Sequence, residues 1–151
     1  MKLRFNREEA TEALSAACTV AALRTPKEIL KCVRVEALPD AMLLSATDLE
    51  LGWRVAVTQG EGDEPGDTLV VADTLSRIVR ECSDEVLLAE TTARELHVRG
   101  AGSHFQIITQ APSDFPPVPT LDAEPDFTIE NGLLRQMIEW TVFASAREST
   151  R

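Results

Sequence analysis

The sequence predicts an α+β protein in which two helices pack on antiparallel sheets, and three observations support this prediction. Residues 1–109 contain one order of elements twice: a strand, a helix and three strands. The opening pattern also returns near the end of the chain, where Phe127 takes the place of Leu3 and Ile138 the place of Leu14. Finally, 151 residues with 44% hydrophobic and 26% charged side chains can bury a core without a metal or a disulfide.

The first module begins with a strand over residues 2–5 and a helix that Asn6 caps. The Asn6 side chain can accept a hydrogen bond from the backbone of the first turn, and the carboxylate of Glu9 is placed to accept one from the backbone of Asn6. Small apolar residues then recur at helical spacing, which predicts a helix that packs closely on a sheet. These residues are Ala10, Ala13, Leu14, Ala17, Cys18 and Ala21.

Three strands complete the first module, over residues 29–37, 41–47 and 49–58. In the last of these, every second residue from Leu49 to Val57 is apolar. Such an alternation predicts one buried face and one exposed face.

The second module repeats this order. Residues 68–71 predict a strand, Asp73 is predicted to cap a helix, and strands follow over residues 86–91, 95–98 and 104–109. The apolar stripe of this helix consists of Leu75, Ile78, Val79 and Cys82.

These elements predict a complete first domain over residues 1–109. A proline-rich connection follows over residues 110–125, either as a linker or as an ordered surface segment. Residues 126–151 then predict the first strand and helix of a second domain. Because the helix over residues 133–146 cannot bury its apolar face alone, we expect the sequence to be a truncated form of a longer protein.

The charge of the chain argues at first against nucleic acid as a partner. It has 15 basic and 25 acidic residues, a net charge of -10, and phosphate binding depends on Lys and Arg. Net charge does not say where the charges lie, however. The second predicted helix has Arg77 and Arg80 on its exposed side, whereas many carboxylates lie in residues 59–67 and 110–126. The two arginines either form a modestly positive face or only solvate the helix.

The compartment is predicted from the cysteines and from the N-terminus. The 3 cysteines are odd in number, far apart and set among apolar residues, so we expect core residues in a reducing compartment. Charged residues precede any apolar run long enough for a signal peptide, and no run approaches the roughly 20 apolar residues that span a bilayer. We therefore expect a cytoplasmic protein without a membrane partner.

Few residues suggest chemistry. Asp48 and Glu50 lie two apart, so in a strand both would leave the same face and could act as an acid and a base. A polar turn in which Asp48 bonds its own backbone is favoured. His97 and His104 have no second His or Cys at metal-ligand spacing, and residues 100–103 predict a hairpin turn. We predict no catalytic residue, no metal and no cofactor.

Several short strings carry a resemblance to one known family. They are MKLRFNRE at the start, ATDLEL at 46–51, VADTLSRIVR at 71–80, SHFQI at 103–107 and PSDFP at 112–116. With these strings and the repeat, the chain resembles the N-terminal domain and the start of the second domain of the bacterial DNA polymerase III beta subunit, the sliding clamp family.

The resemblance implies a DNA clamp fold and a ring of two head-to-tail protomers, whose helices line a channel for double-stranded DNA of any sequence. Such a ring is a processivity factor: it tethers the replicative DNA polymerase, works with a clamp loader and is not an enzyme. The family positions imply that Arg24 and Arg80 lie near DNA, while Ile78, Phe105 and Ile107 meet the other protomer. An apolar pair on the outer face of an edge strand would otherwise be a liability.

The chain also departs from the family pattern. Its first helix carries three glutamates against Arg7 alone, and Asp73 stands where the family often has a basic residue. We therefore expect this chain alone to bind DNA feebly.

Two other functions fit the residues. One is a stand-alone interaction module that pairs with a partner through the edge strand 103–109. The other, less favoured, is a small metal-dependent enzyme that uses Asp48 and Glu50.

Overall fold

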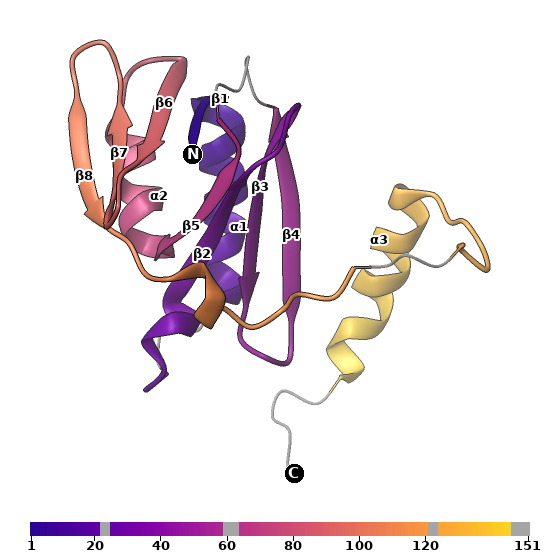
Figure 1. Cartoon of the computed structure of the whole chain (residues 1–151). Coiled ribbons are helices and arrows are strands. Elements are labelled where there is room, and N and C mark those ends of the chain that lie inside the picture. Colours follow the sequence, from indigo (N-terminus) through magenta and orange to yellow (C-terminus); the bar gives the residue numbers. More distant parts are fainter. Residues whose placement is uncertain (22–24, 59–63, 121–123, 146–151) are drawn as a thin grey trace. The chain divides into compact units, whose positions relative to one another are not determined.

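A computed structural model of the chain describes residues 1–21, 25–58, 64–120 and 124–145. The chain divides into two compact units, Met1–Pro119 and Thr120–Arg151. In its described residues the first unit has two α-helices and two four-stranded antiparallel sheets, and Figure 1 shows their arrangement. Its elements are β1 (Lys2–Asn6), α1 (Arg7–Val20), β2 (Cys32–Ala37), β3 (Ala41–Thr47), β4 (Gly52–Thr58), β5 (Gly66–Val71), α2 (Ala72–Glu81), β6 (Val86–Thr91), β7 (Glu95–Arg99) and β8 (His104–Ile108).

The two modules exchange their first strands. The strand orders are β1-β6-β7-β8, called sheet A here, and β4-β3-β2-β5, called sheet B. β1, from the first module, pairs with β6 of the second, and β5 pairs with β2 in the same way. The predicted α+β duplication is confirmed. The outer strands β8 and β4 lie at opposite ends of the unit (Figure 1).

Both helices lie on the same side of the sheets. α1 contacts β3 and β4, α2 contacts β5 and β8, and the helices contact each other. The alternate residues of every strand that face the helices form one continuous apolar core, in which Leu3, Leu44, Val70 and Val98 are fully buried. The predicted stripe of α1 contributes small residues to this core, which lets the helix approach the sheet closely.

The start of α1 agrees with only half of the predicted cap. Asn6 accepts a hydrogen bond from the backbone N–H of Glu9 at 3.1 Å, as expected. The carboxylate of Glu9 does not return to Asn6. It accepts from the backbone N–H of Thr58 at 2.9 Å and so ties α1 to the end of β4. The backbone N–H of Thr58, distant in the sequence, thus takes the place of the backbone N–H of Asn6 as the donor to Glu9.

Other predicted element starts are also corrected. Asp73 does not cap α2, because the chain passes directly from β5 into the helix and Val71 is the N-cap residue. The strand predicted from residue 29 begins at Cys32, since Glu28–Lys31 form a short 3-10 helix.

The strand predicted from residue 49 begins at Gly52, because Asp48–Leu51 form a tight turn. Oδ1 of Asp48 accepts hydrogen bonds from the backbone N–H groups of Leu51, at 2.6 Å, and Glu50, at 2.9 Å. These two bonds lower the pKa of the Asp48 carboxyl. Leu49 takes a left-handed φ of 82°, and both turn leucines are exposed instead of buried.

The segment after β8 crosses the outer face of sheet B. The backbone N–H of Gln110 donates to the carbonyl of Leu69 at 2.9 Å, and Phe115 packs on Cys32 and Leu69. A Cβ added to Gly52 would lie 3.0 Å from Cγ1 of Val118, so the segment touches the start of β4 before the unit ends. Residues 110–119 are thus an ordered surface connection.

The second unit contains α3 (Asn131–Thr141) and a 3-10 turn, Val142–Ala144. The apolar stripe of α3 is exposed: 47% of Met137 and 53% of Ile138 is accessible to solvent. The predicted strand before α3 is not formed among residues 124–130. A strand needs a partner, as β1 has in β6, and residues 124–130 pair with no strand within the described residues.

No helix in the described part of the chain is both long and apolar enough to cross a membrane.

The strand exchange predicts that the two sheets unfold together. We expect Leu3→Ala in β1, whose side chain is fully buried, to lower the free energy of unfolding by about 3 kcal/mol. Trp53 in β4 would report on sheet B in a Trp140→Phe background, and its fluorescence should change at the same lowered urea midpoint as the far-ultraviolet signal. Val86→Ala, at an exposed position, is the control. A Trp53 transition unmoved by Leu3→Ala would contradict the coupling.

The turn predicts a pH-dependent effect of Asp48. Because the Asp48 pKa is lower in the folded chain, the ionised carboxylate stabilises the fold above the unfolded value of about 3.9, and this contribution is lost as pH falls through the lower folded value. Asp48→Ala should therefore lower the urea midpoint at neutral pH, and its difference from the wild type should shrink in acid. Glu50→Ala, an exposed carboxylate in the same turn, is the control. If the urea midpoint of Asp48→Ala were lower than that of the wild type by the same amount at neutral and at acid pH, the stabilising role of the hydrogen-bonded carboxylate would be contradicted.

Candidate nucleic-acid interface

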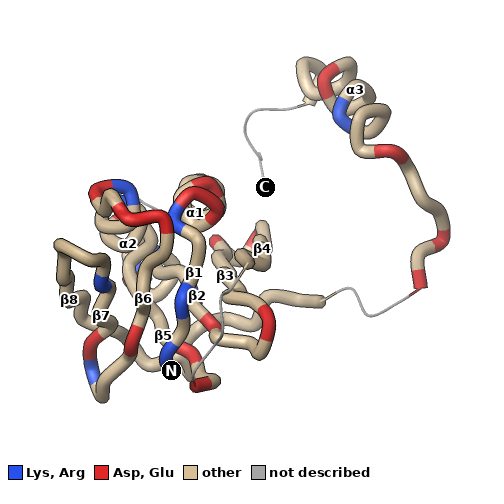
Figure 2. Tube along the Cα trace, turned by 90° about the horizontal axis from the view of Figure 1, so that it is seen from above, with Lys and Arg blue, Asp and Glu red and all other residues tan. Residues whose placement is uncertain are grey.

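The candidate interface is the outward side of α1 and α2. Figure 2 looks along the unit from above and shows the two helices side by side, with the strands on their other side. Small residues meet between the helices, Ser15 and Cys18 of α1 and the buried Ser76 of α2, and allow the helices to lie close together. The helices therefore present a continuous polar surface away from the sheets, which we call the helix face.

The helix face is not strongly basic. The two helices carry three arginines and five carboxylates. The basic residues are Arg7, Arg77 and Arg80, and the acidic residues are Glu8, Glu9, Glu12, Asp73 and Glu81. The alternation of red and blue along α1 and α2 is visible in Figure 2. Phosphates would therefore meet isolated positive groups and not a basic patch.

Both predicted arginines of α2 are on this surface. Arg77 lies 3.6 Å from Asp73, but the two side chains are 74% and 56% exposed, so the ion pair is weak and screened. Nη2 of Arg80 lies 3.5 Å from the hydroxyl oxygen of Ser15 on α1. Arg80 therefore reaches across the seam between the helices, and its guanidinium remains exposed. Arg24, the third predicted residue, lies outside the described residues.

The seam also contains Cys18. Burial raises the pKa of the Cys18 thiol, a hydrogen bond with Ser76 opposes this, and Asp73 raises it further while Arg80 lowers it. Because burial is the largest of these causes, the thiol is protonated and unreactive near neutral pH.

The predicted interface residues lie at the edge of the core. Ile107 is 6% exposed, and Phe105 and Ile78 are partly buried against the same core cluster. The expectation that Phe105 and Ile107 lie on the outer face of β8 is therefore wrong: the alternation of β8 turns both toward α2, and Ile108, 80% exposed, is on the outer face instead.

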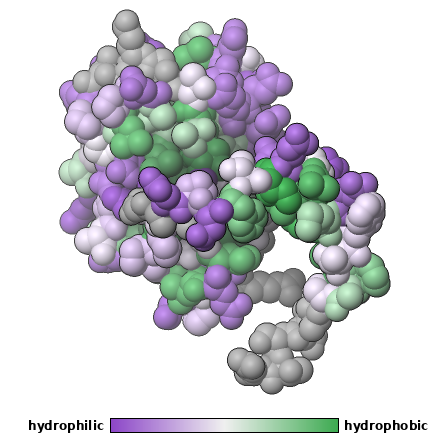
Figure 3. Space-filling model, turned by 90° about the vertical axis from the view of Figure 1, so that its right-hand side faces the viewer, coloured by the Kyte–Doolittle hydropathy of each residue, from purple (hydrophilic) through white to green (hydrophobic). Residues whose placement is uncertain are grey.

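The other end of the unit has a corresponding open edge. A groove of about 280 Å³ lies along α1 and β4 and is lined by Ala13, Ala16, Trp53 and Val55, among others. Figure 3 is viewed from the β4 side of Figure 1 and shows apolar residues, in green, at the surface there. The sequence pattern places Trp53 and Val55 in the core, but an edge strand leaves them only half-buried.

Asp48 and Glu50 do not form a catalytic pair. The Asp48 carboxylate is occupied by the turn backbone, and the direction of its pKa change is opposite to that of a general acid working near neutral pH. Within the described ranges, no group of three or more His, Cys, Asp or Glu side chains is placed to hold a metal.

Sequence reasoning missed one pair of residues. His97 and His104 meet across the β7–β8 hairpin, with Nδ1 of His97 and Nε2 of His104 3.0 Å apart. The two strands and the hairpin turn were predicted, so counting the register outward from residues 100–103 would have placed both rings on one face as diagonal neighbours.

Comparison with known proteins identifies the family. Residues 1–120 match the DNA polymerase III beta subunit, N-terminal domain. The beta sliding clamp of Chlamydia muridarum is 26% identical over 152 residues, which cover 100% of this chain and 41% of that protein.

Solved structures agree. The DNA polymerase III subunit beta from Pseudomonas aeruginosa has a TM-score of 0.89 at 27% identity, covering 100% of this chain and 41% of that one. The Caulobacter crescentus pol III beta has a TM-score of 0.88 at 28% identity, and the match covers 99% of this chain and 40% of that one. The chain thus spans about two fifths of the length of these relatives and has the fold of the part that it covers. It belongs to the family of the DNA polymerase III beta subunit, whose N-terminal domain it matches over its first 120 residues.

Proposed function

We propose that this chain is part of a DNA sliding clamp, a processivity factor that encircles duplex DNA in the cytoplasm and tethers the replicative polymerase, without catalytic activity of its own. In this proposal residues 1–109 form the first clamp domain, residues 110–125 the connection, and residues 126–151 the beginning of a second domain. A clamp loader and a second, head-to-tail protomer are the further partners.

One observation carries the proposal: the first unit has both helices on one side and an open sheet edge at each end, β4 and β8. Each open edge is flanked by partly buried apolar side chains, Trp53 and Val55 at β4 and Phe105 at β8. A unit of this form can be joined to similar units at both ends, so that the sheets continue as an outer wall and the helices remain inside.

The charge of the helix face fits a sliding contact. With only a few exposed arginines among carboxylates, duplex DNA would be attracted weakly and without regard to sequence. Long residence would then come from the closed ring, because the duplex can leave only when an interface opens. Arg77 and Arg80, together with Arg24, are the proposed phosphate contacts.

The proposed protomer interface is the β8 edge. Phe105, Ile107 and Ile78 lie where the core reaches this edge, so a partner strand paired with β8 would cover the half-buried Phe105 and extend the core. Residues of this kind suit a stable interface better than residues on the outer face would.

A stand-alone interaction module that uses residues 103–109 is the alternative. The length of the gene distinguishes the two functions: a reading frame with further copies of the repeat supports the clamp, and one that ends at codon 151 supports the module.

The proposed DNA contacts predict a small, sequence-independent effect. Arg77→Ala and Arg80→Ala should each reduce the slope of log binding constant against log salt concentration for duplex DNA by about 0.9, which is the effect of one lost phosphate contact. The reduction should be the same for unrelated DNA sequences. Fluorescence anisotropy across a salt series measures this. Arg99→Ala, which removes an arginine from the outer face of sheet A, is the control and should change nothing. A loss confined to one sequence would contradict backbone contact.

The proposed ring predicts that Phe105→Asp prevents dimerisation of the full gene product, because a carboxylate would be buried in the joint. Sedimentation at micromolar concentration measures the dimer, and thermal unfolding shows whether the Phe105→Asp variant is folded. If Phe105→Asp does not fold, Phe105→Ala is used instead and is expected to weaken the dimer. Ile108→Asp, on the outer face of the same strand, is the control and should remain dimeric. A folded Phe105→Asp variant that still dimerises would refute the β8 interface.

A further inference from the structure

The two histidines of the chain meet on the outer face of sheet A, away from the helices. In the β7–β8 ladder Arg99 pairs with His104 and His97 with Gln106, so the two imidazoles are diagonal neighbours. Nδ1 of His97 and Nε2 of His104 are 3.0 Å apart, and the rings lie 5.3 Å apart between centroids with 28° between their planes. Each ring thus directs a nitrogen at the other.

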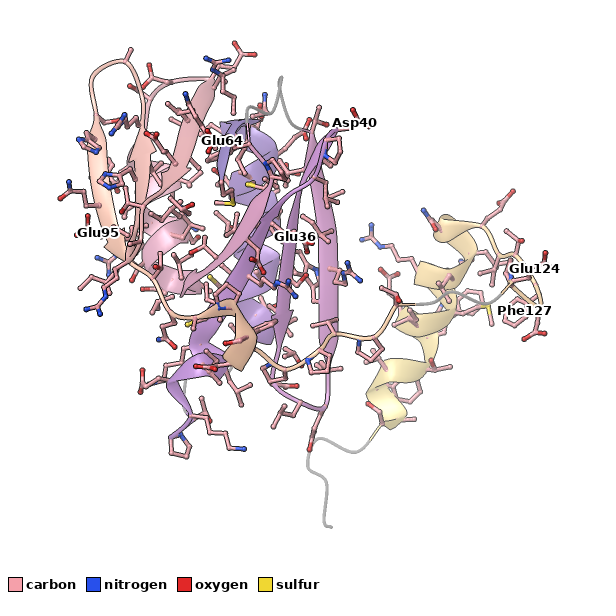
Figure 4. All side chains as sticks on the ribbon, viewed as in Figure 1. Glu36, Asp40, Glu64, Glu95, Glu124 and Phe127 are labelled. Atoms are coloured by element: carbon pink, nitrogen blue, oxygen red, sulfur yellow. The ribbon has the colours of Figure 1, made fainter. Side chains whose placement is uncertain are left out.

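The surroundings of His97 favour a free lone pair on Nδ1. Only 8% of His97 is exposed, and a carboxylate oxygen of Glu95 lies 3.5 Å from its Nε2. Figure 4 labels Glu95 on β7. A carboxylate at this position stabilises a proton on Nε2, which leaves Nδ1 as an acceptor or a ligand. A carboxylate behind an imidazole in this way is common around metal-binding histidines.

We propose that Nδ1 of His97 and Nε2 of His104 bind a late first-row transition-metal dication, such as Ni²⁺, Cu²⁺ or Zn²⁺, between β7 and β8. With metal–nitrogen distances of about 2.1 Å, two nitrogens 3.0 Å apart subtend roughly 90° at the metal, the angle of a square-planar or octahedral site. A tetrahedral angle needs a separation of about 3.4 Å, which a small rotation of the exposed His104 ring provides.

The remaining ligands are water and one neighbouring side chain. Gln106 lies directly opposite His97 on the same face, and its amide oxygen is a candidate for a third ligand. Glu95 stays on the far nitrogen of His97 and orients the ring.

The local charge tolerates a dication. Arg99, opposite His104, is paired with Glu90 at 3.2 Å, so its charge is compensated, and Glu95 adds a negative charge near the site.

The proton between the two rings can be accounted for as well. In this proposal Glu95 holds the His97 proton on Nε2, so Nε2 of His104 is the donor to Nδ1 of His97 in the free chain. On metal binding the Nε2 proton of His104 moves to its Nδ1, and both facing nitrogens become ligands without net proton release.

The site is independent of the proposed function, because it lies on the opposite face of the sheet from the helices. It also differs from a magnesium site, since imidazole nitrogen suits late transition metals, whereas Mg²⁺ prefers oxygen ligands.

Calorimetric titration of the tag-free chain with NiCl₂ and with ZnCl₂ tests the proposal. We expect one metal per chain, no binding of MgCl₂, and an affinity at least tenfold lower in His104→Ala, which removes one ligand from an exposed position. Ile108→Ala, on the same face of the same strand, is the matched control and should bind as the wild type does.

The imidazole signals in nitrogen-15 NMR give a second readout, because the chain contains 2 histidines and every imidazole signal comes from this pair. Both rings should shift on addition of metal. Binding that leaves these signals in place, or that persists unchanged in His104→Ala, would assign the metal to cysteines or carboxylates and overturn the proposal. His104→Gln is the substitute if the alanine variant does not fold, and the same loss is expected.

Discussion

The exchange of first strands between the two modules is the constraint on which the rest of the structure depends. β1 has no partner in its own module and pairs with β6, while β5 pairs with β2. Neither module can complete its sheet alone, so the two sheets, the shared core and the side-by-side placement of the helices form together. These pairings join residues far apart in the sequence, which favours slow but cooperative folding.

This arrangement also reconciles the proposed DNA partner with a net charge of -10. The exchange puts both helices on one side, and the few exposed arginines there face the same direction while many carboxylates lie elsewhere on the chain. Asp73 lies beside Arg77 and weakens the attraction of the helix face for phosphates. The proposed ring would not need strong binding to stay on a duplex, because its closed form, more than the local charge, would determine how long the partners remain together.

Periodicity predicted nearly every element of the first unit, because the alternation in strands such as β3 and the stripe of α2 record which side each residue buries. Three features were not predictable in this way. Glu9 finds its partner on β4, residues 124–130 form no strand, and the two histidines meet only when β7 and β8 pair. Each depends on pairing that the alternation within one segment does not record. The favoured polar turn, in which Asp48 bonds its own backbone, is confirmed, and only the burial that the alternation assigned to Leu49 and Leu51 was wrong. The resemblance implied which residues of β8 would meet another protomer, and the register of β8 shows which way their side chains face.

The path of residues 110–119 gives the unit a polarity. After β8 this segment runs across sheet B, where Gln110 bonds Leu69 and Phe115 packs on the sheet, and then reaches Gly52 at the start of β4. The covalent exit is therefore at the opposite end from β8. In the proposed ring, a neighbour in the same polypeptide would be tethered at the β4 end and a separate molecule would meet the β8 end, so the direction of the backbone would distinguish the intramolecular joint from the intermolecular one.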